Sequence, residues 1–225
     1  MLMNSSNSSN RKFELLRLLP LGAIAGPVLF TLAWVVLGFL SDGYTIYGER
    51  IEPYSAVTQP ISGLGMGATA PYMNGAFIAS GILLFAGLLG VFRRMRDYGK
   101  PSIRKACLAS FALSPIGLIV CGLYDLEQTL MHSIGFLLST GTTVVSFVIG
   151  GFYFRDIPNW RRFGNAMLAG SPLTLLLVIF FFMSFDPIAA GQGVGIGGIA
   201  SRVLALEVLG WFALMGWNAW ANRLE

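Results

Sequence analysis

The hydrophobic positions of this chain fall into six long runs that show no period-two alternation. The runs cover residues 18–40, 73–92, 106–124, 132–154, 166–185 and 199–220. A helix needs about 20 mostly apolar residues to cross a bilayer, and in hydrocarbon only helices and closed barrels satisfy every backbone polar group. Because barrel strands alternate in polarity, the pattern predicts an all-α fold, a polytopic six-helix transmembrane bundle.

Composition and charge agree with this prediction. Hydrophobic residues make up 55% of the 225 positions and charged residues only 12%, about half the share found in soluble domains. The net charge of +4 does not indicate nucleic-acid binding, because the basic residues lie in short loops between the apolar runs. The two cysteines form no CxxC or Cys/His pattern, so neither a metal nor a cofactor is indicated. We expect membrane lipids as the surroundings.

The Lys and Arg residues predict the orientation. Thirteen of them fall on one side of the expected bundle, and only Arg50 and Arg202 fall on the other. Because basic loops are retained in the cytoplasm, both termini are expected there, in a multi-pass protein of the plasma membrane. Residues 1–12 are expected to form a disordered cytoplasmic N-terminus, and residues 13–225 a single transmembrane domain.

A small residue followed by proline recurs in the first, third and fifth runs, as Gly26-Pro27, Ser114-Pro115 and Ser171-Pro172. This suggests three helical-hairpin repeats, although such pairs are common enough in membrane helices that coincidence is an open alternative. Proline removes a backbone hydrogen bond and clashes with the preceding turn. The three helices are therefore expected to kink, and kinked helices can open an internal cavity.

The longest connection, residues 41–72, is expected at the outer face. Its segment 61–67 (ISGLGMG) is apolar and rich in glycine, which permits a tight backbone. A long connection without obvious secondary structure is usually functional or disordered. The segment either dips into the bundle or lies against the bilayer as a simple interfacial loop.

His132 is the only histidine and opens the fourth run. From it Gly135, Ser139, Thr142 and Ser146 follow at helical spacing. Such a face either lines a polar pocket or packs closely against a neighbouring helix. Together with His132, Ser62 and Asp125 also have the residue types of a nucleophile, an orienting acid and a base, although no GxSxG motif accompanies them.

Glu207 lies within the sixth run, and carboxyl groups inside a membrane are rare and by default functional. A buried carboxyl needs either a partner or a proton. His132, Arg50 and Arg202 are the available partners. The alternative is that the sixth helix starts later and leaves Glu207 at the interface.

Several of these residues carry a resemblance to a known family. They are Gly26-Pro27, Ile61-Ser62-Gly63-Leu64, Tyr72 with Asn74, and Asp125 with His132. Together the chain resembles, over nearly its whole length, the bacterial and archaeal membrane proteins grouped as domain of unknown function 998. The resemblance implies a compact helical bundle and brings no established activity. Members often have a proline and an aspartate before the histidine, whereas residues 121–125 keep the aspartate and lack the proline.

Three functions remain open, and with them whether the protein is an enzyme. The first is binding or transport of a lipid-like or small amphipathic molecule in an outward-facing pocket, with ligand-binding candidates Glu207, His132, Asn74, Ser139 and Thr142. The second is a membrane-embedded lipid hydrolase or transferase, with catalytic candidates Ser62, Asp125 and His132. The third is an accessory protein that packs against a membrane partner or another copy of itself.

Overall fold

The computed structural model describes residues 17–221, and six helices in this range are long and apolar enough to cross a membrane. The spans are η1 (Leu19–Leu21) with α2 (Gly22–Leu40), η3 (Gly67–Thr69) with α3 (Ala70–Arg94), α4 (Pro101–Leu123), the three segments α5 (Thr129–Phe136), η4 (Leu137–Gly141) and α6 (Thr142–Arg155), then α7 (Arg161–Ser184) and α9 (Gly197–Ala221). The predicted all-α bundle is confirmed, and the chain is a multi-pass membrane protein surrounded by lipid. The expected disordered segment, residues 1–12, lies outside the described residues.

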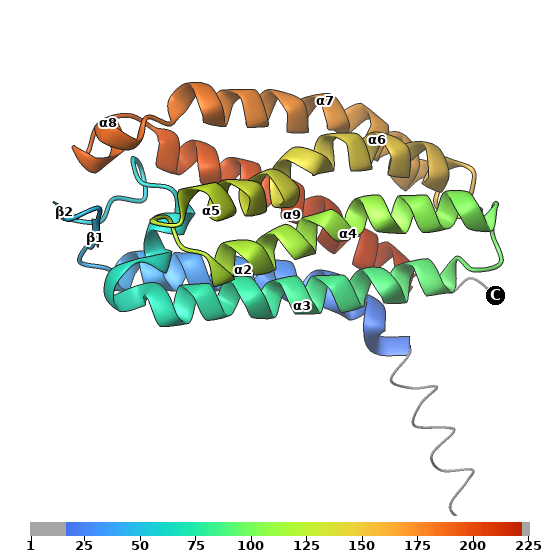
Figure 1. Ribbon diagram of the computed structural model, residues 1–225. Coiled ribbons are helices and arrows are strands. Elements are labelled where there is room, and N and C mark those ends of the chain that lie inside the picture. Colours follow the sequence, from blue (N-terminus) through green and yellow to red (C-terminus); the bar gives the residue numbers. More distant parts are fainter. Residues whose placement is uncertain (1–16, 222–225) are drawn as a thin grey trace, which may run out of the picture.

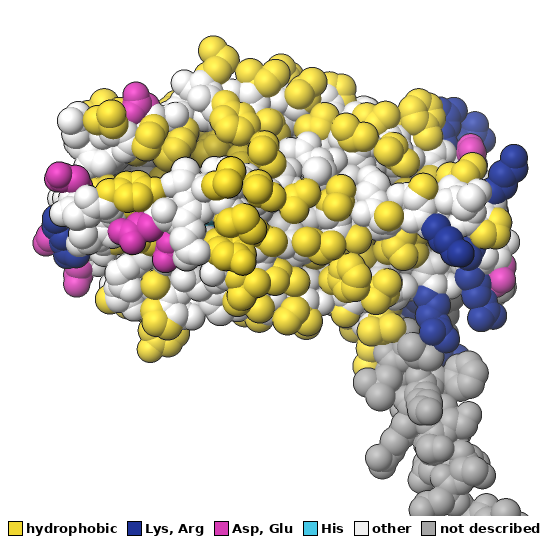
Figure 2. Space-filling view, in the orientation of Figure 1, with side chains coloured by type: hydrophobic (Ala, Val, Ile, Leu, Met, Phe, Trp, Pro, Cys, Tyr) yellow, Lys and Arg dark blue, Asp and Glu magenta, His cyan; other side chains and the backbone are white. Residues whose placement is uncertain are grey.

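Each span packs against the next one in the chain, and α9 packs against both α7 and α2, so the bundle closes on itself (Figure 1). Basic side chains gather at one end of the bundle, where Arg93, Arg104, Arg155 and Arg161 lie (Figure 2). We call this the basic end. Residues 41–69 cover the opposite end, which we call the loop end. An even number of spans places Arg17 and Ala221 together at the basic end; that this end is cytoplasmic remains a prediction.

The irregular helical turn lies in the fourth span, outside the three spans in which the prolines predict kinks. Pro27, Pro115 and Pro172 lie inside the continuous helices α2, α4 and α7. The fourth span, in contrast, contains a π-helical turn, η4. Such turns widen the helix and leave carbonyl groups without their usual donors. The threefold repeat stays a prediction.

Aromatic rings fill the half of the bundle nearest the basic end. Phe92, Phe111 and Phe154 lie with ring centroids about 6 Å apart, and Trp160 stacks on Phe154 at 5.1 Å. Such tilted and edge contacts add to the burial energy of each ring. Buried rings occupy the interior of this half, and the internal cavity described below lies in the loop half.

The connection at the loop end is more structured than its sequence suggests. Strands β1 (Tyr44–Ile46) and β2 (Glu49–Ile51) form an antiparallel hairpin, and the 3-10 helix η2 (Ile61–Gly65) follows. Leu64 and Ile61 are buried, and η2 contacts α2, α3 and α9. Residues 61–65 therefore dip into the bundle. Glycine is needed here, because a Cβ at Gly63 would lie 2.9 Å from the Tyr44 ring.

Candidate functional site at the loop end

Arg202 of α9 fastens the buried part of the loop. Its Nη1 donates to the carbonyls of Ala56, Gln59 and Gly198, each at 2.9 Å. Its Nη2 donates to the Tyr54 hydroxyl, and the guanidinium lies 5.9 Å from the centroid of the Tyr54 ring. The sequence offered Arg202 as a partner for Glu207; the structure instead surrounds it with carbonyl groups and aromatic rings.

A second set of hydrogen bonds to the loop comes from η3 and α3. Asn74 Nδ2 donates to the Gly65 carbonyl at 3.1 Å, and Thr69 Oγ1 donates to the Leu64 carbonyl at 2.7 Å. Backbone groups of η2 thus have side-chain partners from the helix that follows. Asn74 was a candidate ligand-binding residue; it holds the loop and does not line the cavity described below.

Ser62 of η2 meets His132 of α5, although 70 residues separate them in the chain. The Ser62 Oγ and His132 Nε2 atoms lie 2.8 Å apart. His132 Nδ1 lies 2.8 Å from the Tyr124 carbonyl, which can only accept a hydrogen bond. Nδ1 therefore carries a proton, and in the neutral form of His132 the lone pair of Nε2 faces the Ser62 hydroxyl. The imidazole is 7% exposed, so this pair is held inside the bundle.

Asp125 does not hydrogen-bond to His132, so it is not the orienting acid that the sequence predicted. Its Oδ1 accepts from the backbone N–H groups of Glu127 and Gln128, at 3.0 and 3.4 Å. It therefore caps the turn between α4 and α5, as aspartate does at helix starts. The group that orients the imidazole is the Tyr124 carbonyl next to it.

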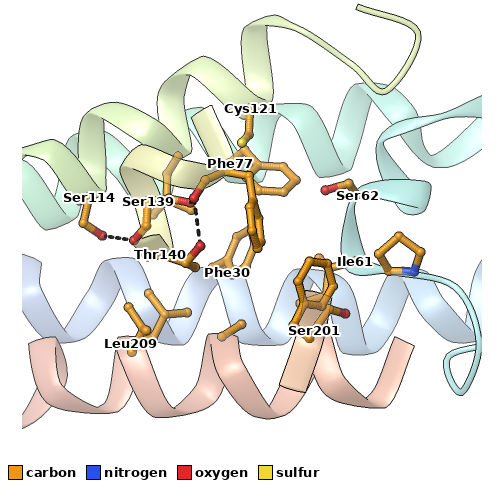
Figure 3. Close-up of a pocket in the computed structure, with 16 residues that line it drawn as sticks. Phe30, Ile61, Ser62, Phe77, Ser114, Cys121, Ser139, Thr140, Ser201 and Leu209 are labelled. Carbon is orange, nitrogen blue, oxygen red and sulfur yellow. Dashed lines mark hydrogen bonds between the residues drawn. The ribbon is translucent and has the colours of Figure 1, made fainter. Parts of the chain in front are cut away.

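A cavity of about 80 Å³ lies beside Ser62, within the loop half of the bundle. Its apolar wall comes from six helices and includes Phe30, Phe77, Leu118, Phe136, Phe181 and Leu209. Figure 3 shows Ser62 on one side of it and Ser114, Ser139 and Thr140 on the other. An apolar cavity of roughly 150 Å³ binds a benzene ring, so this one has room for the end of an alkyl chain.

The hydroxyl groups on the far side of the cavity are hydrogen-bonded to the backbone. Ser139 and Thr140 donate to the Phe136 carbonyl at 3.0 and 2.8 Å, and Ser114 donates to the Ser139 carbonyl at 2.7 Å. The π turn supplies the Ser139 carbonyl, and the residue just before the turn supplies the Phe136 carbonyl. Thr142, predicted on the same face as Ser139, bonds to Leu138 and does not line the cavity, because the wider turn shifts the helix register.

Glu207 belongs to a different place, the contact of α9 with α7. Its Oε1 accepts from Thr174 Oγ1 at 2.8 Å and from Trp211 Nε1 at 2.7 Å. Oε2 is buried with no hydrogen-bond partner among the described residues. His132 bonds elsewhere and Arg50 pairs with Glu52 at 2.8 Å, so none of the partners suggested by the sequence contacts Glu207.

A comparison with protein families settles what the chain is related to. The family described as "Protein of unknown function (DUF998)" matches residues 24–218. The chain belongs to the DUF998 family. No curated protein and no solved structure matches it. In this DUF998 protein several of the residues that carried the resemblance lie at contacts between elements. Gly26 packs α2 on α3, where a Cβ would meet the Ser80 carbonyl at 2.7 Å. At the loop end Ser62 contacts His132, and Asn74 donates to the Gly65 carbonyl.

Several residues of the site were not predicted from the sequence. The Tyr124 carbonyl has no side-chain signal, and Phe30, Phe77 and Phe136 are ordinary members of apolar runs. Thr140 was accessible in principle, because it stands in the run of hydroxylated residues at 139–143 (STGTT) within an otherwise apolar helix. Such runs bond to nearby carbonyls, and here they mark the π turn.

Proposed function

We propose that this DUF998 protein binds the alkyl chain of a lipid-like or small amphipathic molecule in the loop-end cavity. The observation that carries the proposal is a mostly apolar cavity whose wall includes Ser62, the hydroxyl that is hydrogen-bonded to His132. Binding sites for such ligands are concave, mostly apolar and contain a few placed polar groups. With the basic end in the cytoplasm, the cavity lies in the outer half of the plasma membrane.

Photo-crosslinking tests this proposal. A palmitic acid with a diazirine at the end of its chain is added to the purified protein, and the labelled peptides are mapped by mass spectrometry. We expect labels on Phe136 and Leu209. The variant Ala205→Leu fills the cavity, and overpacking of about 1–3 kcal/mol lowers labelling at least about fivefold. Ala25→Leu, an identical change on an exposed surface of α2, leaves labelling unchanged. Equal labelling in both variants would refute the proposal.

The geometry of Ser62 favours a second candidate, acyl transfer. His132 Nε2 is placed to take the proton from Ser62 Oγ as this oxygen attacks an acyl carbonyl carbon. The acyl group would pass to Ser62 and then to water or an alcohol, while the His132 imidazolium returns its proton to the leaving group. The Tyr124 carbonyl would stabilise the imidazolium through Nδ1–H.

A fluorophosphonate probe separates the two candidates. Acyl transfer predicts covalent labelling that Ser62→Ala abolishes and that Ser201→Ala leaves intact. Ser201 is the matched control, because it lines the same cavity and donates to the Gly198 carbonyl at 2.9 Å. Absence of labelling on Ser62, with alkyl crosslinking retained, leaves binding as the function and excludes the transferase.

A further inference from the structure

A second hollow, of about 450 Å³, opens at the basic end between η1, α3 and α4. The cationic side chains that line it are Arg93, Arg96, Arg104 and Lys105. No carboxylate among the described residues lines it. Topology signals account for the number of basic residues at this end. They do not account for the convergence of four of them on one hollow.

Two of the four cationic side chains bond to other groups of the protein, and for the other two no such bond is found in the described part of the chain. Arg104 donates to the carbonyls of Met95 and Arg96 and so holds the connection from α3 to α4. Arg96 lies 3.3 Å from Asp97 in an exposed ion pair. Within residues 17–221, the side chains of Arg93 and Lys105 have no hydrogen bond or ion pair. They are exposed and available to a ligand.

The floor of the hollow is apolar and lies toward the bilayer. Leu89 precedes Arg93 by four residues on α3, and Leu108 follows Arg104 by four on α4. Residues four apart share one face of a helix, one turn apart. Because α3 ends and α4 begins at the basic end, both leucines lie one turn deeper than the cations. The hollow thus presents positive charge at the interface and hydrocarbon-like surface beneath it.

We propose that this hollow binds an anionic phospholipid of the leaflet at the basic end. Arg93 and Lys105 contact the phosphate, and the first methylenes of an acyl chain lie against Leu89 and Leu108. Guanidinium and ammonium groups both bind phosphate through charge-assisted hydrogen bonds, and basic pockets between membrane helices are typical sites for anionic headgroups. A soluble anion would gain nothing from the apolar floor, which favours a lipid.

Native mass spectrometry of the full chain in mild detergent tests this. The protein is titrated with phosphatidylglycerol and, separately, with phosphatidylcholine of identical acyl chains. The wild type is expected to retain phosphatidylglycerol preferentially. The double variant Arg93→Gln/Lys105→Gln loses about 25-fold in that affinity, about fivefold for each charge. Arg161→Gln/Arg162→Gln removes the same charge from the same end without touching the hollow, and we expect less than about a twofold change.

Two results would overturn the proposal. Equal losses in both double variants would mean that only the general surface potential attracts the lipid. Displacement of phosphatidylglycerol by excess glycerol 3-phosphate would mean that the hollow binds a soluble phosphate. If the double variant does not fold, the single variants Arg93→Gln and Lys105→Gln are compared in the same way with Arg161→Gln. Retention of phosphatidylglycerol by Ala205→Leu separates this site from the loop-end cavity.

Discussion

Replacement of Arg202 by methionine tests how the buried loop is held. Methionine keeps an apolar stem against the neighbouring rings and removes every donor. The wild-type guanidinium is 9% exposed and serves three backbone carbonyls and the Tyr54 hydroxyl. Within residues 17–221 the ion pairs are formed by other arginines, so its charge is compensated by carbonyl dipoles and aromatic faces alone.

The magnitude follows from the acceptors that lose their donor. Each buried acceptor left unpaired costs about 1–3 kcal/mol. Some of the three carbonyls can bind water at the loop end, so we expect a loss of about 3 kcal/mol. For a chain of this size, 1 kcal/mol corresponds to about 2–4 °C in Tm. Arg202→Met should therefore lower Tm by about 6–12 °C. Arg202→Lys keeps the charge but not the planar fork, so its Tm should lie between those of Arg202→Met and the wild type.

Thermal unfolding in detergent, followed by tryptophan fluorescence, measures the effect, and hydrogen exchange of residues 53–65 locates it. Arg50→Ala is the matched control, because Arg50 lies at the same end in an ion pair whose side chains are about half exposed. Such pairs contribute about 0–1 kcal/mol. A Tm for Arg202→Met equal to that of the wild type would refute the reasoning. It would show that desolvation of the guanidinium cancels its hydrogen bonds.

Three further predictions concern stability. Glu207→Gln keeps an acceptor oxygen and should lower the free energy of unfolding by less than about 1 kcal/mol. Glu207→Leu leaves Trp211 Nε1 unpaired and should lower it by about 2–4 kcal/mol, measured by thermal unfolding. Equal losses in the two variants would contradict the role of the carboxyl oxygen. Gly63→Ala should destabilise the protein by about 1–3 kcal/mol. Gly75→Ala, in open space on α3, should stabilise it by up to about 1 kcal/mol. If Gly63→Ala leaves the stability unchanged, the close packing at Gly63 is contradicted. Burial, with nearby Tyr54 as a smaller cause, raises the pKa of Tyr44 from 10.0 to about 12. The stability that the protonated Tyr44 hydroxyl contributes is therefore complete below pH 10 and is lost as the pH rises toward 12. A pH profile of stability that is the same in Tyr44→Phe would contradict this.

The bundle was predictable because the physics of spanning helices is local. A segment in hydrocarbon must satisfy its own backbone groups, so each apolar run predicts one helix without knowledge of its neighbours. The structured loop was not predictable in the same way. Residues 61–65 lack helical periodicity, and their burial depends on distant partners. Asn74 of α3 donates to the Gly65 carbonyl, and Arg202 of α9 donates to the carbonyl of Gln59 just before the segment.

The candidate site shows the same division. The chemistry of Ser62 and His132 was readable from their types, and the structure brings them together. The group that orients His132 is a main-chain carbonyl, which no side-chain pattern reveals. Trp211 could have been found as a partner of Glu207, because residues four apart share a helix face. Thr174 could not, because its contact depends on how α7 packs on α9.

We propose that the apolar cavity beside the Ser62–His132 pair receives an alkyl chain. An electron cryo-microscopy structure of the protein in nanodiscs made from native lipid tests this most directly. We expect elongated density between Phe30, Phe136 and Leu209 that ends near the Ser62 hydroxyl, with His132 hydrogen-bonded to Ser62 and to the Tyr124 carbonyl. A cavity closed by its own side chains, with Ser62 turned away from His132, would contradict it.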